Sequence, residues 1–134
     1  MDKLNIAKQY KFNKYHTNLT FNIYQKYQSR INNHFSYQKY KAKDLLGCSI
    51  LFFIKWLNYR KKTIPSSKNI SLFSLTIDHV IPLNSFSDED VYLAFNWRNC
   101  IPVTKEYNLT KKDLRIDELE KEQIELIEKY MQIR

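Results

Sequence analysis

The stretch that decides the fold covers residues 73–83 and reads FSLTIDHVIPL. Its first half alternates apolar and polar residues, because Leu75 and Ile77 each follow a single polar residue. A period of two is typical of a strand that buries one face. The sequence therefore predicts a strand that begins at residue 73 and ends at the polar pair Asp78 and His79.

A second extended segment, residues 97–103, follows after a long polar loop. Pro102 within it favours an edge strand or a strand end, because proline has no N–H for the ladder. Thr104 is a suitable N-cap for a helix over residues 105–113. The middle of the chain is therefore predicted to run strand, loop, strand, helix.

The flanks of this segment are predicted to be helical. Residues 1–43 are expected to be helical or partly irregular, and Ser49 is a suitable N-cap for a helix with apolar residues at i, i+3, i+4 and i+7. Residues 65–67 read Pro-Ser-Ser and mark a boundary. We therefore expect a basic helical region, a central motif and a C-terminal amphipathic helix, at residues 1–64, 65–115 and 116–134.

Composition excludes several classes of protein. The chain has 134 residues, 43% of them apolar, which is ordinary for one globular domain and too apolar for a disordered chain. No apolar run is long enough for a membrane span, and the start does not resemble a secretory signal. The two cysteines form no CxxC pair, so no structural zinc is expected, and a single glycine excludes glycine-rich phosphate loops. We expect an intracellular protein without a membrane partner.

The positive charge is concentrated in the N-terminal half. Residues 1–64 hold 13 Lys and Arg against 2 Asp and Glu, whereas the net charge of the whole chain is +8. Such asymmetry suggests a polyanionic partner, and the interleaved aromatic residues favour nucleic acid over a membrane surface. The basic run Arg60, Lys61 and Lys62 is a candidate nucleic-acid contact. The alternative is a solvated basic surface that only keeps the protein soluble.

Three short motifs stand in order in the middle of the chain. They are IDHVIPL at residues 77–83, NWRN at residues 96–99 and NLTKK at residues 108–112. Together they resemble the HNH endonuclease family, and DLLGCS at residues 44–49 is similar to the segment that precedes DH-x-x-P in HNH proteins of phages and large DNA viruses. The similarity covers about residues 40–113. It implies an α+β fold, a ββα-metal (His-Me finger) HNH motif embedded in a mainly helical small domain.

The resemblance also assigns chemical roles. His79 would be the general base, and a histidine of ordinary pKa suits that role near neutral pH. Asp78 and Asn108 would be metal ligands, and their hard oxygens suit one Mg²⁺ or Mn²⁺ ion rather than zinc. Asn99 matches the central Asn of the family, which orients the histidine or braces the loop.

Lys111 and Lys112 would contact a flanking phosphate, or would be solvated charges at a helix end. Two features depart from the family pattern. The CxxC zinc pair of many HNH proteins is absent, and Leu75-Thr76 stands where the similar viral and phage sequences have Trp-His. The contact made by that Trp-His pair is therefore not expected here.

The resemblance implies a metal-dependent endonuclease that hydrolyses phosphodiester bonds in DNA. One such site breaks one strand, so a monomer would nick DNA and a homodimer would cut both strands. Two alternatives stay open. The chain could be a catalytically silent DNA- or RNA-binding protein that retains the fold, or a nuclease directed at RNA, because both nucleic acids present phosphates.

Overall fold

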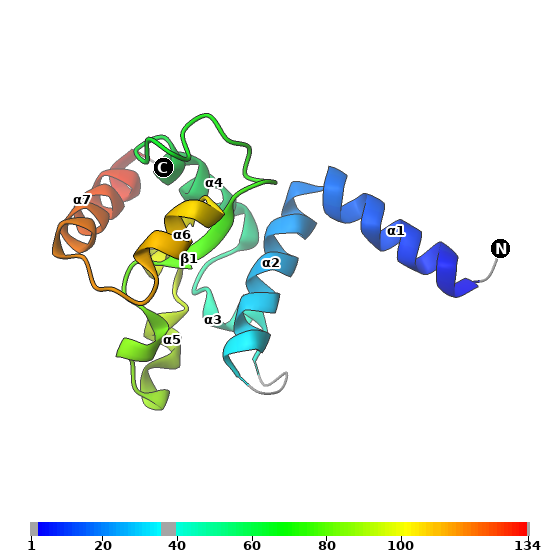
Figure 1. Ribbon diagram of the computed structural model, residues 1–134, viewed down its shortest axis with the longest axis horizontal. Coiled ribbons are helices and arrows are strands. Elements are labelled where there is room, and N and C mark those ends of the chain that lie inside the picture. Colours follow the sequence, from blue (N-terminus) through cyan, green and yellow to red (C-terminus); the bar gives the residue numbers. More distant parts are fainter. Residues whose placement is uncertain (1–2, 36–39, 134) are drawn as a thin grey trace.

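The computed structural model describes residues 3–35 and 40–133, and its fold is α+β and mainly helical. The helices and strands, in chain order, are α1 (Lys3–Thr17), α2 (Leu19–His34), α3 (Ala42–Leu45), α4 (Ile50–Lys61), β1 (Thr76–His79), α5 (Val91–Ala94), β2 (Cys100–Val103), α6 (Lys105–Lys111) and α7 (Asp117–Ile133). Short 3₁₀ turns at Leu83–Ser85, Asp88–Asp90 and Trp97–Asn99 lie between the strands. Figure 1 shows α6 beside β1 and α2 between α1 and the rest of the molecule.

The predicted caps of α4 and α6 are confirmed. The Ser49 hydroxyl accepts a hydrogen bond of 3.1 Å from the amide of Phe52, at the start of α4. The Thr104 hydroxyl accepts one of 3.1 Å from the amide of Tyr107, at the start of α6. Each bond satisfies an amide that has no partner within its own helix.

The two strands form an antiparallel sheet in which Ile77 pairs with Pro102 and Asp78 with Ile101. Every strand of a two-stranded sheet is an edge strand, so the position of Pro102 agrees with the prediction. The strands are shorter than predicted. β1 begins at Thr76 because the ammonium of Lys26 binds the carbonyls of Leu72, Phe73 and Leu75.

The second strand is also shorter, because residues 97–99 form a 3₁₀ turn rather than extended chain. The Asn96 side chain caps this turn by accepting a hydrogen bond of 3.0 Å from the amide of Arg98. Gly47 packs against the same side chain: its φ is +72°, and a Cβ there would lie 2.5 Å from Asn96 Nδ2. The only glycine of the sequence therefore stands where the backbone needs positive φ and a close approach.

One main core joins all three predicted segments of the chain. It includes Ile23 from α2, Trp56 from α4, Leu75 before β1 and Tyr130 from α7. Trp56 and Trp97 are both buried in this core, with ring centroids 5.3 Å apart. The segments therefore fold together around shared apolar contacts.

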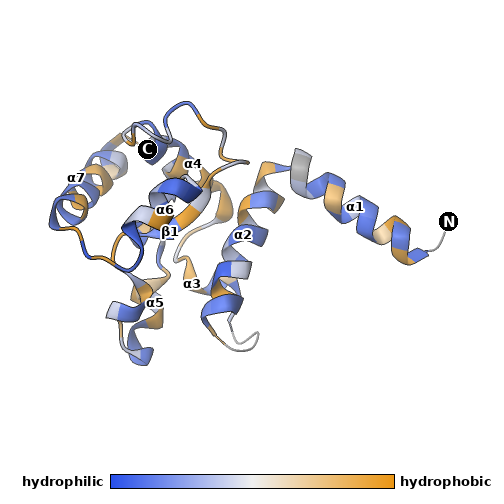
Figure 2. Ribbon diagram, viewed as in Figure 1, coloured by the Kyte–Doolittle hydropathy of each residue, from blue (hydrophilic) through white to orange (hydrophobic). Residues whose placement is uncertain are grey.

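α1 stands apart from this core. None of its described side chains is buried, and the helix extends away from the rest of the molecule (Figure 1). Hydrophobic and hydrophilic residues are interspersed along it (Figure 2). Within the described ranges, no helix combines the length and apolar character that crossing a bilayer requires.

Candidate functional site

A polar hollow of about 210 Å³ lies at the end of β1. It brings together four predicted site residues, Asp78, His79, Lys111 and Lys112, with residues of α2 and of the loop after β1. Its other lining residues are Arg30, His34, Pro82, Leu83, Asn84 and Asp113. Residues that are far apart in the sequence, from Arg30 to Asp113, therefore surround the predicted Asp-His pair.

Asp78 is buried in this hollow, with 3% of the residue exposed. Its Oδ1 accepts a hydrogen bond of 2.8 Å from the guanidinium of Arg30. Its Oδ2 has no hydrogen-bond partner among the described residues, and the ammonium of Lys111 lies 4.0 Å away. A buried carboxylate oxygen without a partner is unfavourable. Oδ2 is therefore a ready ligand for a cation or an acceptor for a donor on a bound molecule.

The hydrogen bonds around His79 determine its tautomer. The Tyr27 hydroxyl donates its one proton to the carbonyl of Phe95 at 2.5 Å. The same oxygen lies 3.3 Å from His79 Nε2, so it must accept there, and the ring nitrogen must donate. It also accepts from the thiol of Cys100 at 3.3 Å. The proton of the neutral imidazole is thereby assigned to Nε2, which leaves the lone pair on Nδ1.

Nδ1 of His79 is buried and has no hydrogen-bond partner within the described chain. Burial lowers the pKa of His79 well below its ordinary value, and the positive charges of Arg30 and Lys111 lower this pKa further. The imidazole is therefore neutral at neutral pH. A neutral imidazole with an available lone pair is the form that can accept a proton from water.

Asn99 braces the loop that follows His79. Its side-chain oxygen accepts from the amide of Ile81 at 2.8 Å, and its side-chain nitrogen donates to the carbonyls of Ile81 and Ala94 at 3.0 Å each. Its own carbonyl accepts from the amide of Val80. Of the two roles that the sequence left open, this arrangement corresponds to the brace.

The C-terminal end of α6 places its two lysines differently. The Lys111 ammonium is buried and donates 3.0 Å to the carbonyl of His79, so it fixes the end of β1. Lys112 is exposed and has a φ of +50°, which turns the chain so that Asp113 also lines the hollow. A positive φ is uncommon outside glycine.

The structure does not bring Asn108 into the lining of the hollow. It is half-buried and lies one turn before Lys111 on the same face of α6. No group of three or more His, Cys, Asp or Glu in the described ranges could hold a metal ion. A Mg²⁺-type site with one carboxylate completes its shell with phosphate and water oxygens. The unpartnered Oδ2 of Asp78 fits such a site.

The structure corrects the prediction for Arg60. Its side chain is fully buried, donates 2.7 Å to Gln123 Oε1 and pairs with Glu122 at 2.9 Å, so it links α4 to α7 and does not face a nucleic acid. Lys61 donates to the carbonyls of residues 68 and 70, and Lys62 is exposed. None of this basic run lines the hollow.

Sequence reasoning missed three residues of α2 that surround the site: Tyr27, Arg30 and His34. The sequence contained a signal for Tyr27. Ile23, Tyr27 and Ile31 recur at intervals of four, which is the spacing of a buried helix face. Arg30 and His34 are polar and four residues apart, and no motif singled them out.

Two relatives come from Acanthamoeba polyphaga mimivirus, and the functions of both are uncharacterized. One is 31% identical over 128 residues, which are 90% of this chain and 56% of that protein. The other is 34% identical over 77 residues, which are 55% of this chain and 34% of that protein. This chain thus spans about half or less of their lengths. No family model matches the chain, and no solved structure matches it.

Proposed function

We propose that this chain is a metal-dependent HNH endonuclease that hydrolyses phosphodiester bonds in DNA. One observation carries the proposal: His79 Nδ1 and Asp78 Oδ2 are buried, have no hydrogen-bond partner among the described residues, and belong to adjacent residues that line one hollow. The first is a proton acceptor and the second a hard metal ligand. Phosphodiester hydrolysis needs both kinds of group.

In this proposal each residue of the hollow has a separate task. His79 takes the proton of the attacking water at Nδ1, while Tyr27 holds its Nε2–H. Asp78 would hold one Mg²⁺ or Mn²⁺ through Oδ2, while Asn108, the second ligand that the resemblance implies, does not line the hollow. When bound, such an ion neutralises charge on the scissile phosphate and the departing oxygen. Lys112, which is exposed at the rim, would contact a flanking phosphate.

Two further residues would act through His79 rather than on the substrate. Asn99 holds the backbone at residues 80 and 81, and Lys111 holds the carbonyl of His79 itself. Both bonds fix the position of the imidazole at the end of β1. Such support is needed because a small displacement of a catalytic group greatly lowers the reaction rate.

A second candidate is a catalytically silent nucleic-acid-binding protein. The observation in its favour is that Arg30 already pairs with Asp78 at 2.8 Å, with Lys111 at 4.0 Å. Two cations beside a carboxylate reduce its attraction for a metal ion. The two candidates differ in one outcome, because only the nuclease makes product when a divalent ion is supplied.

The test is incubation of supercoiled plasmid DNA with the protein and Mg²⁺ or Mn²⁺. We expect nicked product if one site acts alone and linear product if two act together. His79→Ala should lower the rate by roughly 10²- to 10⁴-fold, the usual range for a general base. A chelator should abolish cleavage in the unchanged protein.

His34→Ala is the matched control, because it removes the other imidazole that lines the hollow. We expect it to keep most of the activity, and an equal loss in both variants would place the base elsewhere. Binding of DNA without product in either metal would favour the silent protein. A parallel incubation with structured RNA separates the two substrate classes.

A further inference from the structure

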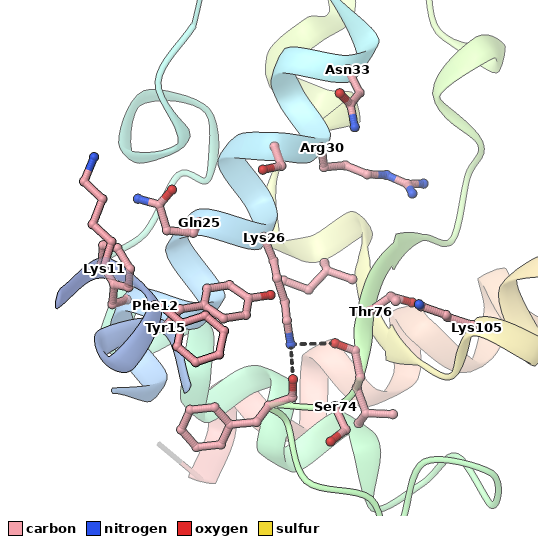
Figure 3. Close-up of a pocket in the computed structure, with 15 residues that line it drawn as sticks. Lys11, Phe12, Tyr15, Gln25, Lys26, Arg30, Asn33, Ser74, Thr76 and Lys105 are labelled. Carbon is pink, nitrogen blue, oxygen red and sulfur yellow. Dashed lines mark hydrogen bonds between the residues drawn. The ribbon is translucent and has the colours of Figure 1, made fainter. Parts of the chain in front are cut away.

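A hollow of about 750 Å³ lies between the N-terminal helices and the sheet. Its walls are α1 and α2 on one side, and residues 73–77 with Lys105 on the other (Figure 3). This groove is distinct from the polar hollow at the end of β1. Among the described residues that line them, Arg30 is shared by both, so the groove and the candidate site border each other at this residue.

The charge of the groove is entirely positive. Among the described residues that line it, four are cationic and none is acidic. The cationic residues are Lys11, Lys26, Arg30 and Lys105. A neutral or cationic molecule gives no reason for such one-sided charge, whereas a chain of phosphates does.

Aromatic rings accompany these charges. Phe12 and Tyr15 come from α1, Phe21 from α2, and Phe73 from the segment before β1. Phe12 is 60% exposed, so its ring is accessible from the groove. A positively charged groove with aromatic rings is typical of proteins that bind unpaired nucleic acid, because bases stack on the rings while cations hold the backbone.

One cation of the groove, the ammonium of Lys26, is held in place by hydrogen bonds. Lys26 donates three hydrogen bonds, to the carbonyls of Leu72, Phe73 and Leu75, at 2.9, 2.8 and 2.8 Å. Figure 3 shows its ammonium between α2 and the segment before β1. These bonds join the two walls, so the groove is a built part of the fold.

We infer that this groove binds an unpaired nucleic-acid strand and directs it past Arg30 to the candidate site. Base readout of a duplex needs an element that projects into one of its grooves, whereas this surface is concave and is lined by aromatic rings on which unpaired bases can stack. The expected substrate is therefore a strand with unpaired bases, such as a single strand, a flap, a loop or a locally unpaired region of a supercoiled plasmid. The inference rests on the proposed function only for what happens beyond Arg30.

The test measures binding in the presence of a chelator, so that it does not depend on cleavage. Fluorescence anisotropy compares labelled oligothymidylate and oligouridylate of about 12 nucleotides, a length within the usual site sizes, with a DNA duplex of equal length. We expect the single strands to bind more tightly than the duplex at every salt concentration. Equal or tighter binding of the duplex would overturn the inference. Oligothymidylate against oligouridylate then separates DNA from RNA.

Matched variants in α1 locate the contact. Lys11→Gln and Lys8→Gln remove the same charge from the same helix, but only Lys11 lines the groove. We expect Lys11→Gln alone to reduce the salt slope of single-strand binding, by about 0.7, the value for one phosphate contact. Equal slopes in the two variants would place the strand elsewhere.

An aromatic pair gives the second readout. Phe12→Ala should weaken single-strand binding about tenfold, the usual loss for one stacked base, and should leave duplex binding unchanged. Tyr10→Ala is its control, because Tyr10 is 65% exposed on the same helix and does not line the groove. In the unchanged protein, preferential binding of single strands without cleavage in Mg²⁺ or Mn²⁺ would refute the proposed function alone. Cleavage without preferential binding of single strands would refute the groove alone.

Discussion

The first two helices have similar composition and different roles. α1 carries four lysines and α2 carries one lysine and one arginine, and neither contains an acidic residue. Yet Ile23, Tyr27 and Ile31 of α2 are at most 1% exposed, whereas Leu4 and Ile6 of α1 are more than half exposed. The spacing of apolar residues along each helix, rather than the composition, explains this difference in exposure.

Apolar residues of α2 recur at intervals of four and therefore share one face. In α1, Leu4 and Ile6 are two residues apart, as are Tyr10 and Phe12, so the two members of each pair point to different sides and the apolar residues do not form a single stripe. Only the first pattern can be buried against a single surface. α2 consequently belongs to the core and positions His79, while α1 lines the groove from outside.

The largest effect expected from this comparison is on stability. Ile31→Ala removes a fully buried side chain and should lower the free energy of unfolding by about 2–5 kcal/mol. Ile6→Ala, in α1, should change it by less than about 0.5 kcal/mol, because the side chain is exposed. Urea unfolding followed by circular dichroism measures both. Similar losses in the two variants would show that α1 packs against the molecule as α2 does.

Local signals in the sequence predicted much of the fold. The caps at Ser49 and Thr104 and the edge position of Pro102 follow from residue type and spacing. The residues at which the strands begin and end did not follow from such local signals. The carbonyls before β1 bind Lys26, which lies about fifty residues earlier in the chain, and no local pattern contains such a contact.

The candidate site was predicted in part for the same reason. The motif located Asp78, His79 and Lys111, which the structure brings to one hollow. Arg60 was misjudged because a run of basic residues gives no sign that one of them turns inward to Gln123. Arg30 reaches the site from a distant helix, which only the tertiary structure shows.

The next effect in size concerns the hydroxyl of Tyr27. Tyr27→Phe removes the acceptor for His79 Nε2–H, so the imidazole can take either tautomer. If the proposed nuclease activity is present, kcat should fall by about 10- to 100-fold with little change in KM, as for other groups that orient a functional histidine. Tyr24→Phe, a half-buried tyrosine of the same helix, should leave kcat unchanged.

A spectroscopic measurement separates orientation of the ring from general damage to the fold. Nitrogen-15 shifts of His79 should show a proton on Nε2 in the unchanged protein and a mixture of tautomers in Tyr27→Phe. An unchanged tautomer in that variant would mean that the Tyr27 hydroxyl does not orient His79, even if the rate falls.

The smallest effect expected is a pH dependence at the groove, where α2 contributes the half-buried cation Lys26 and α1 the exposed cation Lys11. Burial lowers the pKa of Lys26 from 10.5 to about 8. As the pH rises through that value the ammonium loses a proton, so the groove loses one positive charge and one carbonyl loses its donor. Binding of a single strand should therefore weaken on the alkaline side because the groove loses this charge, but by less than the roughly fivefold that one direct phosphate contact contributes at 0.1 M salt.

Lys26→Arg isolates this effect, because a guanidinium stays protonated throughout the range from about pH 7 to about pH 9. Anisotropy titrations at several pH values should show the decline in the unchanged protein and a flat profile in the variant, provided that circular dichroism confirms an intact fold. The same decline in both proteins would assign the titration to another group. A flat profile in both would mean that no strand approaches Lys26. The role of Lys26 would then be to hold α2 against the segment before β1.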